Sequence, residues 1–275
     1  MKNSGSDPSK FTQVLRERKI LIGVVHLQPL PGSPRYQGEG LGPIIDRARA
    51  DVRTLTEAGF DAYIIENFGD APFLSGPSPA YVLTCMARIA AELSTEGPLL
   101  TGVNVLRNDA RGALAVAAAA ELDFVRVNIH TGAALTDQGL ITGEAAASLR
   151  ERQTLAPQVA FLADIAVKHS FPLAADFDLA QAAQETAYRG LADGLIITGA
   201  ATGQAASAED LQTVSEAVPD RPLFVGSGVT ASNVGKIWRV AEGVIVGTAI
   251  KYDGRVEEPV DPARAWEFAA AARKR

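Results

Sequence analysis

The sequence predicts an α/β fold, a single-domain (β/α)8 TIM barrel, because short apolar runs alternate with helix-like stretches eight times along the chain. Its 275 residues match the size of one such barrel, which is typically about 250 residues. The runs are rich in Val, Ile and Leu, as expected of parallel strands buried on both faces. They cover residues 20–25, 62–65, 99–103, 124–127, 159–163, 195–197, 223–225 and 244–246.

The stretches between the runs have the periodicity of amphipathic helices. In residues 43–58 the apolar side chains fall on one face and the charged ones on another, and Gly59 follows where that helix must stop. Asp109 and Asp261 are helix-capping residue types that open two further stretches. Strands followed by helices therefore account for the length of the chain.

The composition is that of a globular protein, with 47% hydrophobic and 21% charged residues. A net charge of −6 argues against nucleic acid or an acidic membrane surface as a partner. Cys85 is the one cysteine, so an intramolecular disulfide is excluded. The first nine residues lack the apolar core of a secretory signal, and no apolar run reaches the ~18 residues of a membrane helix. We expect a cytoplasmic protein with a polar N-terminal extension over residues 1–18 and the barrel domain over residues 19–275.

Polar residues and glycines stand where each apolar run ends, and the long loops 26–42, 68–79 and 129–143 follow runs rather than precede them. Barrel enzymes place their chemistry at the carboxyl ends of the strands, so these residues form a predicted active site. They are His26, Glu66, Asn67, Asn104, Asn128, Asp164, Thr198, Gly199, Gly226, Ser227, Gly228, Gly247 and Thr248.

The glycines after the seventh and eighth runs predict a phosphate site. Glycine lets the backbone approach an anion, and a helix starting near residues 230–233 would direct free N–H groups at it. The alternative is that the glycines only permit tight turns. The residues expected to bind the phosphate are Gly226, Ser227, Gly228, Thr230, Gly247, Thr248 and the nearby Lys251.

Asp164, Lys168 and His169 are the main candidates for catalysis. A carboxylate orients an amine, a desolvated Lys acts as a base or forms a Schiff base, and His titrates near neutrality. A structural ion pair between Asp164 and Lys168 is the alternative. His26 is a further catalytic candidate, although a His at a strand end is often only a hydrogen-bonded core group.

Further polar groups at the strand ends are assigned to substrate or scaffold. Alternation along a strand does not by itself say whether Glu66, a catalytic candidate, or Asn67 faces the lumen. Arg126 either binds substrate or pairs with Glu66 or Asp164, since a buried charge needs a partner. The residues expected to bind substrate here are Asn67, Asn104, Arg126, Asn128 and Thr198.

A metal site is less expected than a metal-free one. Imidazole and carboxylate ligands are present in His26, Glu66, Asp164 and His169, and they suit a divalent metal. No tight spacing such as His-x-His supports such a site, so we expect no cofactor.

Taken together, these motifs resemble the BtpA/SgcQ family over about residues 18 to 270. They include the segments Gly-Val-Val-His-Leu from Gly23, Glu-Asn-Phe-Gly-Asp from Glu66, Gly-Val-Asn-Val-Leu-Arg-Asn-Asp from Gly102 and Gly-Ser-Gly-Val-Thr from Gly226. The resemblance implies a phosphate-binding TIM barrel. The family takes its name from a cyanobacterial role in photosystem I biogenesis, and a related branch is associated with sugar-utilisation gene clusters. It implies no particular reaction.

Three functions remain open from the sequence. The first is an enzyme that acts on a phosphorylated sugar or nucleoside-like compound by acid–base, lyase, isomerase or glycosidic-bond-cleaving chemistry. The second is a non-enzymatic assembly or stability factor for photosystem I, and the third is a sensor of phosphate esters. We expect a phosphorylated small molecule as ligand and self-association into a homo-oligomer.

Overall fold

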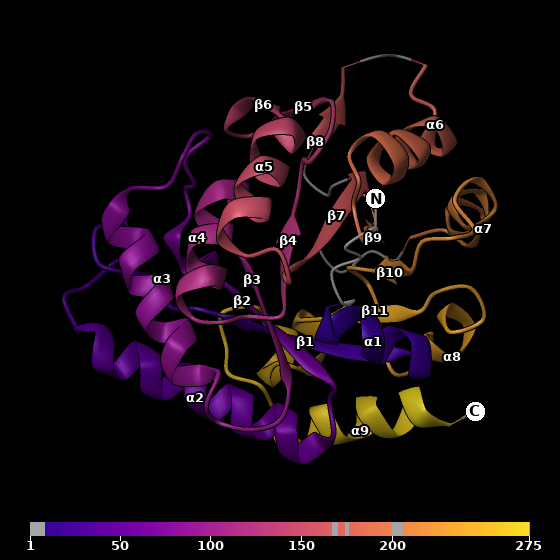
Figure 1. The fold of residues 1–275 in the computed structure, drawn as a ribbon. Coiled ribbons are helices and arrows are strands. Elements are labelled where there is room, and N and C mark those ends of the chain that lie inside the picture. The colour runs from indigo at the N-terminus through magenta and orange to yellow at the C-terminus, as the bar shows by residue number, and fades with distance from the viewer. Residues whose placement is uncertain (1–8, 167–169, 174–175, 200–205, 275) are drawn as a thin grey trace, which may run out of the picture.

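In the computed structural model, eight parallel strands close into a barrel, which confirms the predicted fold (Figure 1). The structure describes residues 9–166, 170–173, 176–199 and 206–274. Around the barrel the strands follow the order β1-β11-β10-β9-β7-β4-β3-β2. Their bounds are β1 (Ile20–His26), β2 (Ala62–Glu66), β3 (Leu100–Asn104), β4 (Phe124–Val127), β7 (Ala160–Ala166), β9 (Gly194–Ile197), β10 (Leu223–Val225) and β11 (Gly243–Val246).

Helices pack around the outside of the barrel (Figure 1). They are α2 (Leu41–Ala58), α3 (Ala80–Leu93), α4 (Ala110–Ala119), α5 (Ala145–Leu155), α6 (Leu179–Gln184), α7 (Ala208–Ala217), α8 (Val234–Ile237) and α9 (Pro262–Arg273). The predicted caps are confirmed: Asp109 accepts from the Gly112 amide, Asp261 accepts from two amides of α9, and Gly59 ends α2 at φ 83°. Such a left-handed residue favours glycine.

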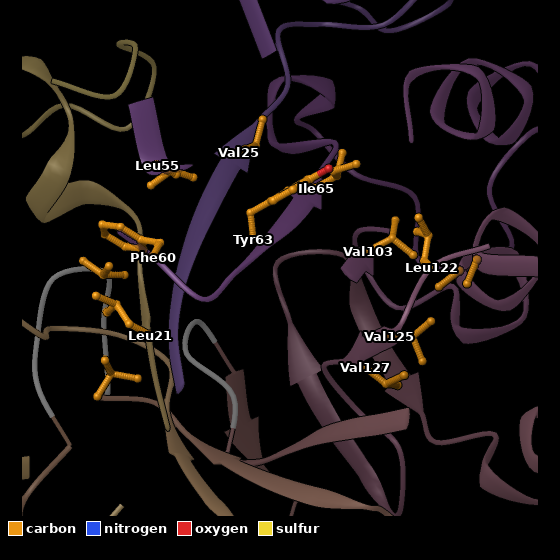
Figure 2. Close-up of a cluster of buried hydrophobic side chains, with 14 of the residues drawn as sticks. Leu21, Val25, Leu55, Phe60, Tyr63, Ile65, Val103, Leu122, Val125 and Val127 are labelled. Carbon is orange, nitrogen blue, oxygen red and sulfur yellow. The ribbon is translucent and has the colours of Figure 1, made fainter. Parts of the chain in front are cut away.

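Side chains alternate between two apolar cores along each strand. The outer core lies between strands and helices, and Figure 2 shows Leu21 and Val25 of β1 with Tyr63 and Ile65 of β2 in it. Burial in this core raises the pKa of Tyr63 to about 12. The residues between them, such as Ile22 and Ile64, belong to the inner core inside the barrel. This two-residue period decides which strand-end residues face the lumen.

A short helix, α1 (Lys10–Glu17), closes the amino-terminal end of the barrel. Its Phe11 is 1% exposed and packs on Phe124 and Phe224, with ring centroids 4.5 and 6.0 Å away. Gly102 makes room for this stack, because a Cβ there would lie 2.3 Å from Phe124. The segment expected as a polar extension thus contributes an aromatic plug to the core, while the domain boundary at residue 18 stays a prediction.

A small antiparallel sheet stands beyond the carboxyl ends of β4 and β7 (Figure 1). It consists of β5 (Ala133–Thr136), β6 (Gly139–Thr142) and β8 (Ser170–Pro172) in the order β6-β5-β8. Residues 129–143, expected as a long loop, instead contain the hairpin of β5 and β6, whose tight turn ends at Gly139, where φ is 94°.

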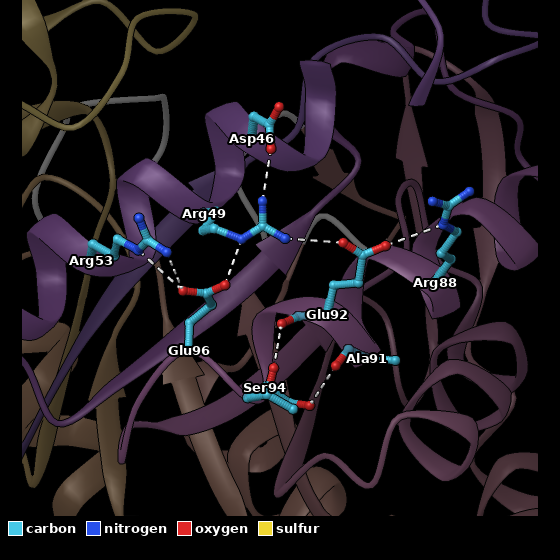
Figure 3. A network of polar contacts seen from close by, with 9 residues as sticks. Asp46, Arg49, Arg53, Arg88, Ala91, Glu92, Ser94 and Glu96 are labelled. Atoms are coloured by element: carbon cyan, nitrogen blue, oxygen red, sulfur yellow. Dashed lines mark hydrogen bonds and ion pairs between the residues drawn. The ribbon is translucent and has the colours of Figure 1, made fainter. Parts of the chain in front are cut away.

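On the outer surface, an ion-pair network joins α2 to α3 (Figure 3). Arg49 contacts Glu92 and Glu96 at 3.0 and 2.5 Å, and Arg53 contacts Glu96 at 3.0 Å. These groups lie on the outside of the barrel and belong to the scaffold. Across the described ranges, every helix is too short or too polar to cross a membrane.

Candidate active site

The two-residue alternation places most of the predicted strand-end residues on the lumen side. Each lies an even number of residues from an inner-core side chain of its own strand, as Glu66 does from Ile64 and Asp164 does from Leu162. The residues with this parity are His26, Glu66, Asn104, Arg126, Asn128, Asp164, Thr198, Gly226 and Gly247. Asn67 has the opposite parity.

Four strands contribute to one buried charge cluster at the top of the lumen. Arg126 donates from Nε and Nη2 to the two oxygens of Asp164, at 3.2 and 3.1 Å, and from Nη1 to Glu66 at 3.3 Å. Asn128 donates to Asp164 at 2.8 Å, and Asn104 donates to Glu66 at 3.1 Å. The sequence suggested Glu66 or Asp164 as the partner of Arg126, and in the structure Arg126 pairs with both.

The electrostatics of the cluster keep Arg126 charged. Burial acts to lower the pKa of Arg126, but the neighbouring carboxylates of Asp164 and Glu66 outweigh it and raise that pKa above its ordinary value. Buried charges need such pairing, because an isolated ion in the interior is strongly disfavoured.

His26 joins the cluster through Glu66. Its Nε2 lies 3.8 Å from Oε2 of Glu66, and its ring packs edge-on against Phe68 at a centroid distance of 4.9 Å. Gly247 also lies close to the ring, since a Cβ there would come within 2.8 Å of the His26 Cε1 atom. An imidazole beside a carboxylate is a common arrangement for general acid–base chemistry.

The cluster forms part of the wall of a pocket of about 1220 Å³ at the carboxyl end of the barrel. Glu66, Asn104, Arg126, Asn128 and Thr198 line it. Among the described residues, the Oδ1 atom of Asn128 is buried without a hydrogen-bond partner. Buried polar groups are nearly always satisfied, so this carbonyl oxygen is a ready acceptor for a donor group of a ligand.

Arg107 belongs to the motif that begins at Gly102 but was not predicted as a site residue, and it also lines the pocket. Arg107 is 7% exposed, and burial lowers the pKa of its guanidinium while Asp164 acts in the opposite direction. The preceding residue is pinned in place, because the Leu106 amide donates to the Asn67 Oδ1 atom at 2.7 Å. Asn67 in turn donates to Asp70 at 3.1 Å. The buried Asn67 thus positions the loop that carries Arg107, a role different from the substrate binding expected of it.

The glycine turn, residues 226–228, lies against the charge cluster. A Cβ on Gly226 would lie 3.4 Å from Nη2 of Arg126 and 3.1 Å from Thr198. Ser227 links this turn to the loop after β9, since its hydroxyl accepts from the Gly199 amide at 2.8 Å. Thr198 and Gly199, which follow β9, therefore lie beside the glycine turn that follows β10, next to Arg126.

The segment after the glycine turn differs from the expectation. The Thr230 amide donates to the Asn233 side chain at 2.8 Å, and the helix that follows, α8, has only four residues. Because that amide is already bonded within the turn, it is not free for an anion. Thr230 therefore stabilises the turn locally.

Of the two lysines predicted for the site, Lys251 lies within the described residues. Lys251 is fully buried, and its amine donates to Asp51 of α2 at 2.9 Å. Burial lowers the pKa of this lysine, and Asp51 opposes that shift. The backbone of Lys251 pairs with Val260, and its amine lies against α2. The structure therefore does not bring Lys251 to the pocket. Lys168, together with His169, lies outside the described residues, and both stay predictions.

The set of metal ligands considered from the sequence is not assembled in the described part of the chain. No group of three or more His, Cys, Asp and Glu side chains there is placed to hold a metal ion. Instead, the Arg126 guanidinium bonds to both Glu66 and Asp164. A cation at these carboxylates would have to displace or share with that guanidinium.

Comparisons with known proteins agree with this architecture. The model of the BtpA family matches residues 17–274. The photosystem I biogenesis protein BtpA of Synechocystis is 42% identical over 259 residues, covering 94% of this chain and 90% of the relative. A protein of Thermococcus kodakarensis is 43% identical over 94% of this chain and 97% of the relative, and a mitochondrial protein of Caenorhabditis elegans is 31% identical over 91% and 92%.

Solved structures with the same fold have low sequence identity to this chain. The phosphoribosyl anthranilate isomerase of Thermus thermophilus has a TM-score of 0.54 at 11% identity, with 92% of this chain and 97% of that chain covered. A KDPGal structure has a TM-score of 0.54 at 18% identity, with 92% and 91% covered. At such identities these likenesses concern the fold alone.

Proposed function

Because the chain belongs to the BtpA family, whose barrel is seen here with a charged mouth, we propose that it is an enzyme acting on a phosphorylated, sugar-like small molecule. The observation that carries this proposal is the buried Glu66–Arg126–Asp164 cluster beside a pocket of about 1220 Å³. Three buried charged groups are costly to place at one end of a barrel, and apolar residues would pack there with less penalty. Their arrangement at the strand carboxyl ends favours chemistry.

The proposed chemistry is proton transfer at a hydroxyl-bearing carbon. Glu66 and His26 form the acid–base pair, because Nε2 of His26 lies 3.8 Å from Oε2 of Glu66. Asn104 and Asn128 orient substrate hydroxyls, and the unpaired Oδ1 of Asn128 accepts from one of them. Arg126 holds the carboxylates in position and supplies positive charge where an oxyanion develops. Isomerisation, carbon–carbon cleavage and glycosidic cleavage all use such groups.

The phosphate is proposed to bind the glycine turn and residues 247–248. The fold places these two turns beside Arg126 and His26, respectively. Loops after the seventh and eighth barrel strands frequently form a phosphate site.

Substitutions at the two carboxylates test the proposal. Asp164→Asn and Glu66→Gln keep the shape of the side chain and remove its charge, so each should lower turnover at least about 100-fold, equivalent to about 2.7 kcal/mol of transition-state stabilisation. Sugar phosphates are first screened for turnover by NMR, and rates are then compared at equal folded fraction. Asp46→Asn, which changes a carboxylate of the surface network, is the control and should leave the rate unchanged. Unchanged rates in both site variants would refute the assignment.

A second function is suggested by the 42% identical relative named for photosystem I biogenesis. A non-enzymatic assembly factor would act through a protein-binding surface and would not need the charge cluster. Relatives in an archaeon and in a nematode, organisms without photosystems, favour a more general role. If Asp164→Asn fully restored photosystem I levels in a cyanobacterium deleted for the corresponding gene, the assembly function would be favoured over the enzyme.

A further inference from the structure

The pocket at the mouth of the barrel has an apolar rim in addition to the charge cluster of Glu66 and Arg126. We infer that the ligand carries a flat nitrogen-containing ring, of the nucleobase class, which binds against this rim. The inference rests on the proposed function, because it concerns the other end of the same phosphorylated ligand. The apolar rim is defined here by Phe68, Phe73, Leu135, Phe171 and Phe177.

Three of the rim side chains are exposed to an unusual degree. Leu135 on β5 is 48% exposed, Phe171 on β8 is 71% exposed, and Phe177, before α6, is 43% exposed. They come from separate segments, and all three line the same pocket. Large exposed apolar groups that gather around one concavity are typical of a binding site, whereas scattered ones need no explanation.

The other two rim residues, Phe68 and Phe73, connect the rim to the proposed acid–base pair. Phe68 packs against His26 at a centroid distance of 4.9 Å, and Phe73 packs edge-on against Phe68 at 6.4 Å. The apolar wall therefore begins directly beside the proposed acid–base pair. A ring attached to the reacting sugar-like part would meet aromatic side chains as soon as it left the floor.

The size of the pocket agrees with a ligand larger than a sugar phosphate. Its volume of about 1220 Å³ is above the ~300–1,000 Å³ of ordinary small-molecule pockets. Glu66, Asn104, Arg126 and Asn128 line one part of this pocket, and the apolar rim lines another part. A ligand that contacts both parts needs an apolar group in addition to a polar, hydroxyl-bearing one.

Polar groups at the same wall favour a nucleobase over a plain hydrocarbon ring. Arg107, with donor groups only, and Asp137, with a carboxylate acceptor, both line the pocket. Arg107 is 7% exposed, and the backbone amide of the preceding Leu106 is bonded to Asn67. Proteins recognise a base by stacking its faces on apolar side chains while polar groups read its edge. The mouth offers both.

Calorimetric titration of the full chain with four probes tests the inference: ribose 5-phosphate, adenosine 5′-monophosphate, uridine 5′-monophosphate and phenyl phosphate. At least one of the two nucleotides should bind about tenfold or more tightly than ribose 5-phosphate, the size expected from stacking one base. Phe171→Ala should remove most of this difference and leave the affinity for ribose 5-phosphate unchanged. Leu140→Ala is the matched control, because Leu140 is 56% exposed on β6 of the same sheet.

The outcomes separate the ring from the phosphate. Equal affinity for ribose 5-phosphate and both nucleotides would overturn the inference and leave the proposed phosphate site standing. Phenyl phosphate binding as tightly as the better nucleotide would overturn the nucleobase class. Failure of all four probes to bind would overturn the proposed function as well. A dimer that dissociates on Phe171→Ala, with nucleotide affinity unchanged, would show that a second copy covers the rim and would also overturn the inference.

Discussion

The two ends of the barrel are filled in opposite ways. At the amino-terminal end, Phe11 stacks on Phe124 and Phe224, and the surrounding inner core is apolar. At the carboxyl-terminal end, Glu66 and Asp164 share Arg126 beneath an open pocket. The same strands thus run from an aromatic plug to a charge cluster.

This difference separates stability from function. Aromatic packing stabilises a fold through buried area and close contact, and it asks nothing of a ligand. A buried triad of charges contributes little net stability, because desolvation offsets much of the attraction between the ions. We therefore expect the plug to hold the barrel together and the charge cluster to bind and transform the substrate.

The largest effect on stability is expected at the plug. Phe11→Ala should lower the free energy of unfolding by about 3–5 kcal/mol, the range for a buried phenylalanine, because it leaves a cavity between Phe124 and Phe224. Chemical denaturation followed by circular dichroism measures this loss. Ligand affinity of the folded protein should not change.

The same substitution at the opposite end is the control for the plug. Phe171 is 71% exposed, so Phe171→Ala should change the unfolding free energy by less than about 0.5 kcal/mol. Similar losses for both variants would contradict the contrast between the two ends.

A smaller effect is expected from pH, through His130 in the loop after β4. Burial lowers the pKa of His130 below its ordinary 6.5, and Nε2 contacts the Gly190 carbonyl at 2.7 Å. Below pH 6.5 the unfolded chain binds a proton at this imidazole, whereas the folded chain does not. The free energy of unfolding therefore decreases as the pH is lowered. The slope is at most about 1.4 kcal/mol per pH unit.

His130→Gln separates this contribution from other titrating groups, because the amide keeps a donor for Gly190 and does not titrate. Denaturation curves measured at pH 7, 6 and 5 give the free energy of unfolding at each pH. Between pH 7 and pH 5 this free energy should decrease less for the variant than for the original chain. Parallel pH profiles would mean that His130 does not account for the acid sensitivity.

The fold was predictable because its strands are buried on both faces. Continuous apolar runs predicted the bounds of each barrel strand to within three residues. For β10, residues 223–225 were expected and Leu223–Val225 is observed. The mouth sheet was missed because β5 and β6 are short, partly exposed strands whose pairing depends on a turn at Gly139 and on β8 far along the chain. Phe11 was hidden in a polar segment.

Part of the site was also predictable, through strand ends that carry polar residues. The lumen side of Glu66 followed only once the inner core fixed the parity of β2, since an isolated strand has no inside. The prediction for Lys251 was wrong because its closeness to Thr248 in the sequence does not reveal that its amine donates to Asp51 of α2. Arg107 was quoted within the motif from Gly102 but was assigned no role, because it lies three residues beyond the end of β3 and the sequence does not show that Asn67 anchors the preceding Leu106.

The central claim is that the mouth of the barrel binds a phosphorylated ligand between the glycine turn and the charge cluster. Anomalous diffraction from crystals soaked in tungstate, a heavy analogue of phosphate, tests it most directly. We predict an anomalous peak in the mouth, against residues 226–228 and 247–248 and above Arg126. Tungstate sites found only elsewhere on the molecule, with the mouth empty at saturating concentration, would contradict the account.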